Sequence, residues 1–261
     1  MFSKSNIVFE KDIFSDKAST IDKETIINSI YELAVKEIST LGIISLEKII
    51  IGKVDLFEKT LGSARINCGK SEIKLSRKTA VELVNKNDSS RYKNAFATFK
   101  HEFYHVYDYE HIRVNLLKNS VGGFTKEQDG FDMWTEFFAA YSTFDIYEQN
   151  NIYESFEYVF KNDADNTKQK KYYTCQLLGY YMHNNHASVC DDLIRKYLNE
   201  SCVKKISNLL NSLIAIYPNI SLENLIDLHK LIEDVILPKT NLGNYIPVDI
   251  NDIWKSFQRR K

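Results

Sequence analysis

The sequence predicts a mainly helical α+β protein in which a small mixed sheet packs on one helix and more helices follow. Only three prolines and nine glycines occur in 261 residues, so long helices are favoured. Isoleucine and valine concentrate in short stretches between residues 46 and 76, where we expect strands. From residue 168 onward, apolar residues recur at helical spacing, which indicates a helical carboxy-terminal region.

Composition is that of an ordinary globular chain, with 44% apolar and 26% charged residues. The net charge of -1 and the pI near 6.6 argue against a nucleic-acid partner, because phosphate binding requires a basic surplus. No apolar stretch approaches the length of a membrane span, so no membrane partner is expected. Charges interrupt the amino terminus before a signal-peptide core could form, and the four cysteines are widely spaced. We therefore expect a cytoplasmic protein with free thiols.

Three regions follow from the pattern: an arm at 1–20, a core at 21–150 and a helical subdomain at 151–261. Within the core, apolar residues at helical spacing predict a helix over 22–40, which Gly42 ends. A run rich in isoleucine and valine predicts a buried strand over 46–57. Alternating polar and apolar residues on both sides of a Gly-Lys turn predict a hairpin over 65–76.

The most informative stretch is His101-Glu102-x-x-His105, within a helix predicted over 91–110. On a helix, positions i and i+4 lie about 40° apart, so both histidines can reach one metal ion. Glu102 lies about 100° from His101, where it can lean over a water at the metal. This spacing is typical of catalytic zinc sites. The opposite face of the helix is apolar and should pack in the core; it carries Tyr92, Phe96, Phe99, Phe103 and Val106.

A third metal ligand is needed, and two candidates stand downstream. After a connection at 111–124, a strongly aromatic helix contains Glu136, and a carboxylate among aromatics is costly to bury unless it is paired or binds a metal. Its neighbours Ala139 and Ala140 are small enough to allow close approach to the histidine helix. The rival is His111, which has metzincin spacing but lacks the expected Gly at position 108 and a methionine turn.

Three aspartates near these candidates have weaker assignments. Asp129 and Asp132 are lesser ligand candidates that could instead hold a histidine ring. For Asp108 we expect a solvated position on the helix. The next expected role for Asp108 is to hold a metal-ligating residue from behind. The region beyond 150 should contain helices over 168–186, 188–200, 202–216 and 221–236, with His229 at the surface or satisfied.

The histidine helix, followed by Trp134-Thr-Glu136-Phe-Phe-Ala139-Ala140, resembles the zincin metallopeptidases over residues 20 to 150. It is most similar to gluzincin-type and compact ImmA/IrrE-like members, which take the third zinc ligand from a downstream glutamate. The resemblance implies one Zn²⁺ per chain held by His101, His105 and Glu136. It also implies that the strand over 72–76 forms the rim of the cleft and pairs with an extended peptide.

The function implied is hydrolysis of a peptide or protein substrate, with Glu102 taking a proton from water at the zinc and passing it to the leaving amine. Zincins commonly add a Tyr or His donor for the oxyanion. Tyr181 and His183 are the candidates, from a cluster that also holds Tyr180 and His186. Two alternatives remain open: a zinc amidase acting on a small substrate, or a catalytically silent zincin-fold binding or regulatory protein.

Overall fold

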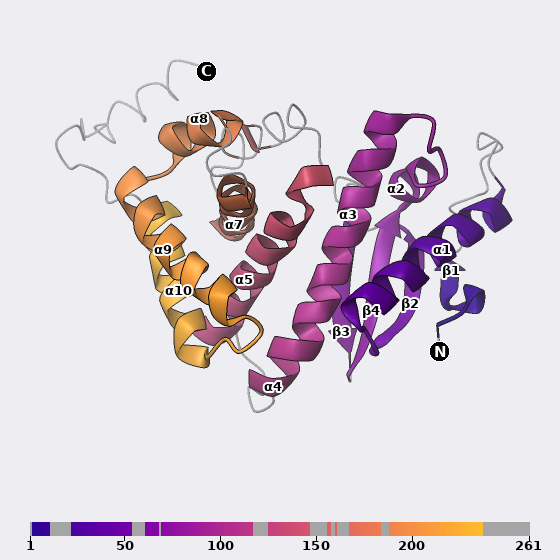
Figure 1. The fold of residues 1–261 in the computed structure, drawn as a ribbon, viewed down its shortest axis with the longest axis horizontal. Helices are drawn as coiled ribbons and strands as arrows, with labels where there is room; N and C mark the ends of the chain where they lie inside the picture. Colours follow the sequence, from indigo (N-terminus) through magenta and orange to yellow (C-terminus); the bar gives the residue numbers. More distant parts are fainter. Residues whose placement is uncertain are drawn as a thin grey trace, which may run out of the picture.

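A computed structural model describes residues 2–10, 22–53, 61–67, 69–116, 125–146, 156–157, 160, 167–183 and 188–236. Figure 1 shows two blocks, one holding the sheet with helices α1 to α3 and the other holding helices α5 and α7 to α10. The expected mainly helical architecture with a small mixed sheet is confirmed. No helix within the described ranges combines the length and apolar character that a membrane crossing requires.

The sheet has four strands in the order β1-β2-β4-β3. Strands β1 (Ile7–Phe9), β2 (Leu46–Gly52) and β4 (Lys70–Ser76) are parallel, and β3 (Gly62–Asn67) pairs antiparallel with β4 at the edge. The predicted hairpin is therefore confirmed, whereas the strand expected over 46–57 ends at Gly52 and residues 54–60 lie outside the described part.

The strand expected at the rim of the cleft was assigned to the wrong half of the hairpin. Residues 72–76 belong to β4, which is paired on both sides by β2 and β3, so its backbone cannot accept a further strand. Strand β3 is the edge strand beside the histidine helix. The order of strands is a long-range property, which explains why alternation within the hairpin did not distinguish its two arms.

Helix α1 (Lys23–Leu41) begins and ends where its end signals predict. The Asp22 carboxylate accepts a hydrogen bond from the Thr25 amide at 2.8 Å, and Gly42 adopts a left-handed conformation with φ of 66°. A short helix, α2 (Arg77–Glu82), was not predicted; Ser76 caps it directly at the end of β4. Six residues are too few for a periodic signal.

Helix α3 (Ser89–Asp108) carries the histidines and is capped by Asp88. It runs on into a π-helical turn, η2 (Tyr109–Arg113), and a short helix, α4 (Val114–Leu116). The connection expected from residue 111 therefore starts as helix, and residues 117–124, including the Gly122-Gly123 pair, lie outside the described part.

Each of the two blocks has its own apolar core. The sheet, α1 and one face of α3 form the first core, and α5 (Lys126–Thr143) belongs to the second. The second core also includes α7 (Thr167–His183), α8 (Ser188–Tyr197), α9 (Glu200–Ile216) and α10 (Leu222–Ile236), where the four carboxy-terminal helices were predicted. Because α5 packs with these helices, the cores divide between α3 and α5 and not near the predicted boundary at 150.

Helix α5 lies very close to α7 at one glycine. A Cβ atom on Gly179 would stand 2.5 Å from the Phe137 carbonyl oxygen and 2.9 Å from Cβ of Ala140, so only glycine fits there. Ala140 therefore faces α7, although we had expected it to face the histidine helix. The described cysteines Cys175, Cys190 and Cys202 are free thiols, as predicted.

Candidate metal centre

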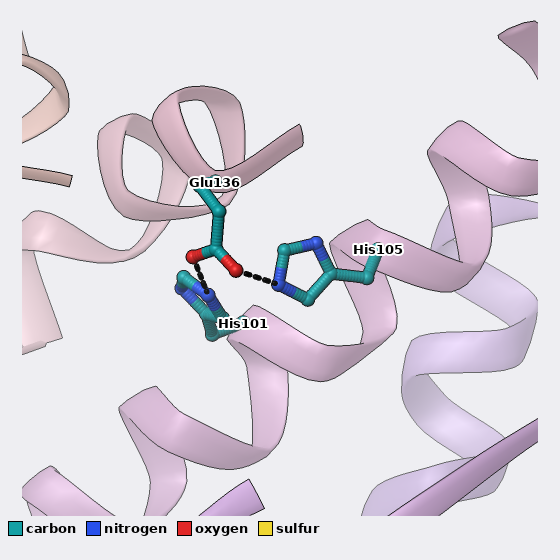
Figure 2. A group of neighbouring side chains, drawn as sticks. All are labelled: His101, His105 and Glu136. Carbon is teal, nitrogen blue, oxygen red and sulfur yellow. Dashed lines mark ion pairs between the residues drawn. The ribbon is translucent and has the colours of Figure 1, made fainter. Parts of the chain in front are cut away.

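His101, His105 and Glu136 converge between α3 and α5. Figure 2 shows both imidazoles, one turn apart on α3, pointing at the carboxylate that α5 brings from the opposite side. His101 Nε2 lies 3.4 Å from Glu136 Oε2, and His105 Nε2 lies 3.7 Å from Oε1. Ligand-capable atoms of the three residues all lie within 4.8 Å of one another. The structure thus brings together the three residues that the sequence put forward, and this cluster could hold a metal ion.

The spacing of the cluster fits a metal better than a set of hydrogen bonds. The separations of 3.4 and 3.7 Å exceed ordinary N–H···O distances. Ligand atoms about 2.0–2.2 Å from one tetrahedral zinc stand about 3.3–3.6 Å from each other. Two imidazoles and one carboxylate are also a donor set that catalytic zinc sites use. The Glu136 side chain keeps 19% of its surface exposed, so the cluster is not sealed from solvent.

The electrostatic surroundings favour the metal-binding forms of His105 and Glu136 but not of His101. Burial acts to lower the pKa of His101, but hydrogen bonding to Glu136 and the charges of Glu136 and Glu102 raise it overall. Burial lowers the pKa of His105 to about 4, so its imidazole is neutral near pH 7. Burial acts to raise the pKa of Glu136, but its contacts with the two histidines and a hydrogen bond from Gln176 lower it overall. Gln176 Nε2 of α7 donates to Glu136 Oε2 at 2.7 Å and so fixes the carboxylate.

Glu102 lies beside the cluster, buried and without a partner for Oε2 among the described residues. Burial raises its pKa to about 8, which a nearby divalent cation would offset by favouring the carboxylate. Strand β3 packs closely on Glu102, because a Cβ atom on Gly62 would stand 2.7 Å from Glu102 Oε1. An orphaned carboxylate oxygen next to two imidazoles is a suitable acceptor for a water proton.

Behind His105 lies a polar group that α5 supplies. His105 Nδ1 is 2.8 Å from the Thr135 hydroxyl oxygen, which leaves Nε2 facing Glu136. Asp108 is fully buried nearby, so the solvated position expected for it was wrong. Burial raises the pKa of Asp108 to about 7, against hydrogen bonds from Tyr217 and Thr135 that lower it.

His111 does not join the cluster. Its ring stacks on Tyr107 with centroids 4.0 Å apart, and its Nδ1 lies 2.9 Å from the Tyr107 carbonyl oxygen. The chain stays helical through η2, so it never makes the turn that a third histidine would need. Glu136 is therefore the third residue that the geometry supports.

Asp129 and Asp132 have hydrogen-bond partners other than His101 and His105. Asp132 accepts hydrogen bonds from Gln128 at 2.7 Å and from Tyr172 at 3.3 Å. Asp129 lies 2.9 Å from His229 Nδ1, so His229 is a satisfied residue, as expected. Asp129 therefore holds a histidine ring, but it is the ring of His229 and not that of a candidate metal ligand.

Asp129, His229 and Glu233 form a second group with metal-ligand geometry. The ammonium group of Lys171 already lies among them, ion-paired with both Asp129 and Glu233. A built-in cation balances the two carboxylates, so we interpret this group as an ion-paired junction of α5, α7 and α10.

The two candidate oxyanion donors lie away from the cluster. Tyr181 faces α8 and α9, where it lines a cavity with Asp191 and Arg195. His183 Nε2 pairs with Asp145 at 3.0 Å, and its ring packs on Phe144. Gln176, two turns earlier on α7, is the residue that reaches Glu136. The structure therefore does not bring Tyr181 or His183 to the metal centre.

Tyr180 and His186 were predicted to cluster with Tyr181 and His183. Tyr180 is buried against Phe144 and Phe156. His186 lies outside the described residues.

Sequence reasoning missed a tyrosine that lies next to the site. Tyr109 follows His105 by four residues, on the stripe that already holds His101, and its hydroxyl donates to the Ala64 carbonyl oxygen of β3 at 3.4 Å. Its pKa is raised by burial and by the nearby carboxylates of Asp132, Glu102 and Glu136. The continued i+4 spacing was the available signal.

Comparison with protein families, with curated proteins and with solved structures finds no significant match to this chain. The case for a function therefore depends on the geometry of the site.

Proposed function

We propose that this protein is a zinc-dependent metallopeptidase of the zincin type. One observation carries the proposal: His101, His105 and Glu136 converge on one point while the buried carboxylate of Glu102 stands beside them with an oxygen unpartnered. A structural zinc site has no need of that fourth group, because it requires ligands only. The intact Glu102 therefore favours catalysis over a silent binding protein.

The donor set fits one Zn²⁺ per chain, with His101 and His105 binding through Nε2 and Glu136 through its carboxylate. When bound, zinc polarises a carbonyl and makes water more acidic. The rest of the chemistry belongs to the chain. As the water oxygen bonds to the carbonyl carbon, Glu102 takes a water proton, and it gives that proton to the nitrogen as the C–N bond breaks.

The edge strand β3 supports a peptide as substrate. Leu61 O accepts from Ser76 N, so by the alternation of antiparallel pairs the backbone groups of Gly62 and Ala64 face away from β4. Gly62 lies against Glu102, and Ala64 accepts the Tyr109 hydroxyl. An extended peptide paired with this edge would therefore run past the general base. A small amide would not need such an edge.

Tyr109 is our candidate for the oxyanion donor. Its bond to Ala64 is long, at 3.4 Å, and a substrate strand that pairs with Ala64 would take its place. The freed hydroxyl could then donate to the carbonyl oxygen of the scissile bond.

The deciding experiment compares zinc content and peptide-library cleavage in wild type and Glu102→Gln. The proposal predicts that the variant keeps its zinc and loses cleavage. Equal cleavage by both proteins would remove Glu102 from the mechanism. Zinc in both proteins with cleavage in neither, across a broad library, would favour the silent or small-amide alternatives.

A further inference from the structure

Arg113 is a cationic side chain near the candidate metal centre that pairs with no carboxylate in the described part of the chain. It ends η2, eight residues after His105, and is half-buried. Its Nε donates to Gln128 Oε1 of α5 at 3.4 Å, and its guanidinium carbon lies 6.0 Å from the centre of the Tyr109 ring. Burial raises the pKa of the Tyr109 hydroxyl, and the Arg113 charge acts to lower it. The guanidinium therefore lies next to the candidate oxyanion donor.

Most of the hydrogen-bonding capacity of Arg113 is unused. A guanidinium carries five N–H donors, and only the Nε donor has a partner among the described residues. The two terminal nitrogens form a fork that matches the two oxygens of a carboxylate. Asp132 does not fill this fork, because its oxygens accept from Gln128 at 2.7 Å and from Tyr172 at 3.3 Å. Lys171, by contrast, is ion-paired with two carboxylates.

The direction of β3 leads an extended peptide from Glu102 towards Arg113. Gly62 lies against Glu102, and two residues further along β3 the Ala64 carbonyl oxygen accepts from Tyr109, so β3 and the histidine helix run the same way. Arg113 follows Tyr109 by one helical turn in that direction. Eight helical residues rise about 12 Å and an extended chain advances about 3.3 Å per residue, which places Arg113 about two to four peptide residues from the scissile bond.

We propose that Arg113 is a specificity-determining residue that binds a carboxylate of the substrate, so that the preferred peptide carries an acidic group a few residues from the bond that is cleaved. The inference rests on the proposed function, because it takes a peptide paired with β3 as the substrate. The carboxylate belongs either to an internal Asp or Glu side chain or to the carboxy terminus of a short peptide. Both present two oxygens to the fork.

The test measures kcat/KM of the zinc-loaded full chain on a peptide library in which Glu or Gln is fixed at one position at a time. At one position in the expected range, wild type should cleave the Glu peptide about 10- to 100-fold faster than the Gln peptide, the effect of a charge-assisted hydrogen bond. Arg113→Gln should bring this ratio to about 1, and Arg113→Glu should favour Lys at the same position. Peptides that end at that position, as free acid and as amide, distinguish a terminal carboxylate from a side chain.

Arg91→Gln is the matched control, because it removes the same charge from the exposed beginning of the same helix. Its ratio between the Glu and Gln peptides should stay within about twofold of wild type, since a distant exposed charge is screened. A wild-type ratio near 1 at every position, with acid and amide peptides cleaved alike, would overturn the proposal. A preference that persists in Arg113→Gln would overturn it as well.

Peptide binding separates this inference from the proposed function. Glu102→Gln protein should bind the Glu peptide about 10- to 100-fold more tightly than the Gln peptide, and addition of Arg113→Gln should remove the difference. Equal binding of the two peptides would contradict the role of Arg113. Absence of cleavage by wild type would instead refute the proposed function, and the binding ratio would still decide this inference.

Discussion

The two faces of the candidate metal centre are built by different means. On α3, helical geometry alone places His101 and His105 together, since residues four apart share a face. On α5, Glu136 reaches the centre only because a separate core holds that helix in place, through contacts with α7 and α10. A local motif thus supplies half of the site, and the packing of distant elements supplies the other half. Changes to the two halves should therefore have different consequences.

The largest effect is expected in the α3 half. Glu102→Gln removes the base and keeps the side-chain volume, so peptide cleavage should fall about 10²- to 10⁴-fold at unchanged zinc content. Glu127→Gln, at a half-buried position in the first turn of α5, is the control and should leave both quantities unchanged. A loss of zinc together with activity would show that Glu102 supports the site and does not act in the reaction.

Removal of the metal tests whether the centre joins the two cores. The proposed zinc site needs α3 and α5 both in place, so excess zinc should raise the free energy of unfolding by about 4 kcal/mol at a thousand times its Kd. The same addition should have little effect on His101→Ala. Thermal unfolding with and without a chelator measures the difference, and identical curves for wild type would contradict the link.

Tyr109→Phe tests whether the tyrosine hydroxyl beside the edge strand β3 acts in catalysis or in substrate binding. If the hydroxyl stabilises the oxyanion, kcat should fall about 100-fold while zinc affinity stays the same. A change confined to KM would instead assign Tyr109 to substrate binding through β3.

Gly179→Ala tests the C-terminal core, at the contact between α5 and α7. The added Cβ meets the Phe137 backbone at 2.5 Å, so the helices must separate at a cost of about 1–3 kcal/mol. Urea unfolding should show the loss of stability, and zinc affinity should also fall as Glu136 moves with α5. Full retention of both would mean that the position of α5 does not depend on α7.

The features that the sequence could predict are those set by local spacing, as on α3, and not those set by the packing of distant elements. Helical spacing, the start of the helix near residue 22 and the stop at Gly42 are local, and the structure has them where we expected. Glu136 was preferred because a carboxylate among aromatics needs a partner, and the structure places it with the histidines. His111 could not be excluded from spacing alone, because the helical continuation through η2 decides its direction.

Long-range contacts account for what was missed. Tyr181 and His183 lie on a helix whose tyrosines spread over about half of its circumference, so the sequence did not reveal which face meets α5. Tyr217 approaches Asp108 from 109 residues away, and no periodicity signals such a contact. The edge position of β3 depends likewise on strand order.

The central claim is that α3 and α5 together hold one metal ion. Zinc content of purified wild type, His101→Ala, Glu136→Ala and His111→Ala tests it most directly. The account predicts about one zinc per chain in wild type and His111→Ala, and a sharp loss in the other two. Full zinc in Glu136→Ala, or loss of zinc only in His111→Ala, would contradict it.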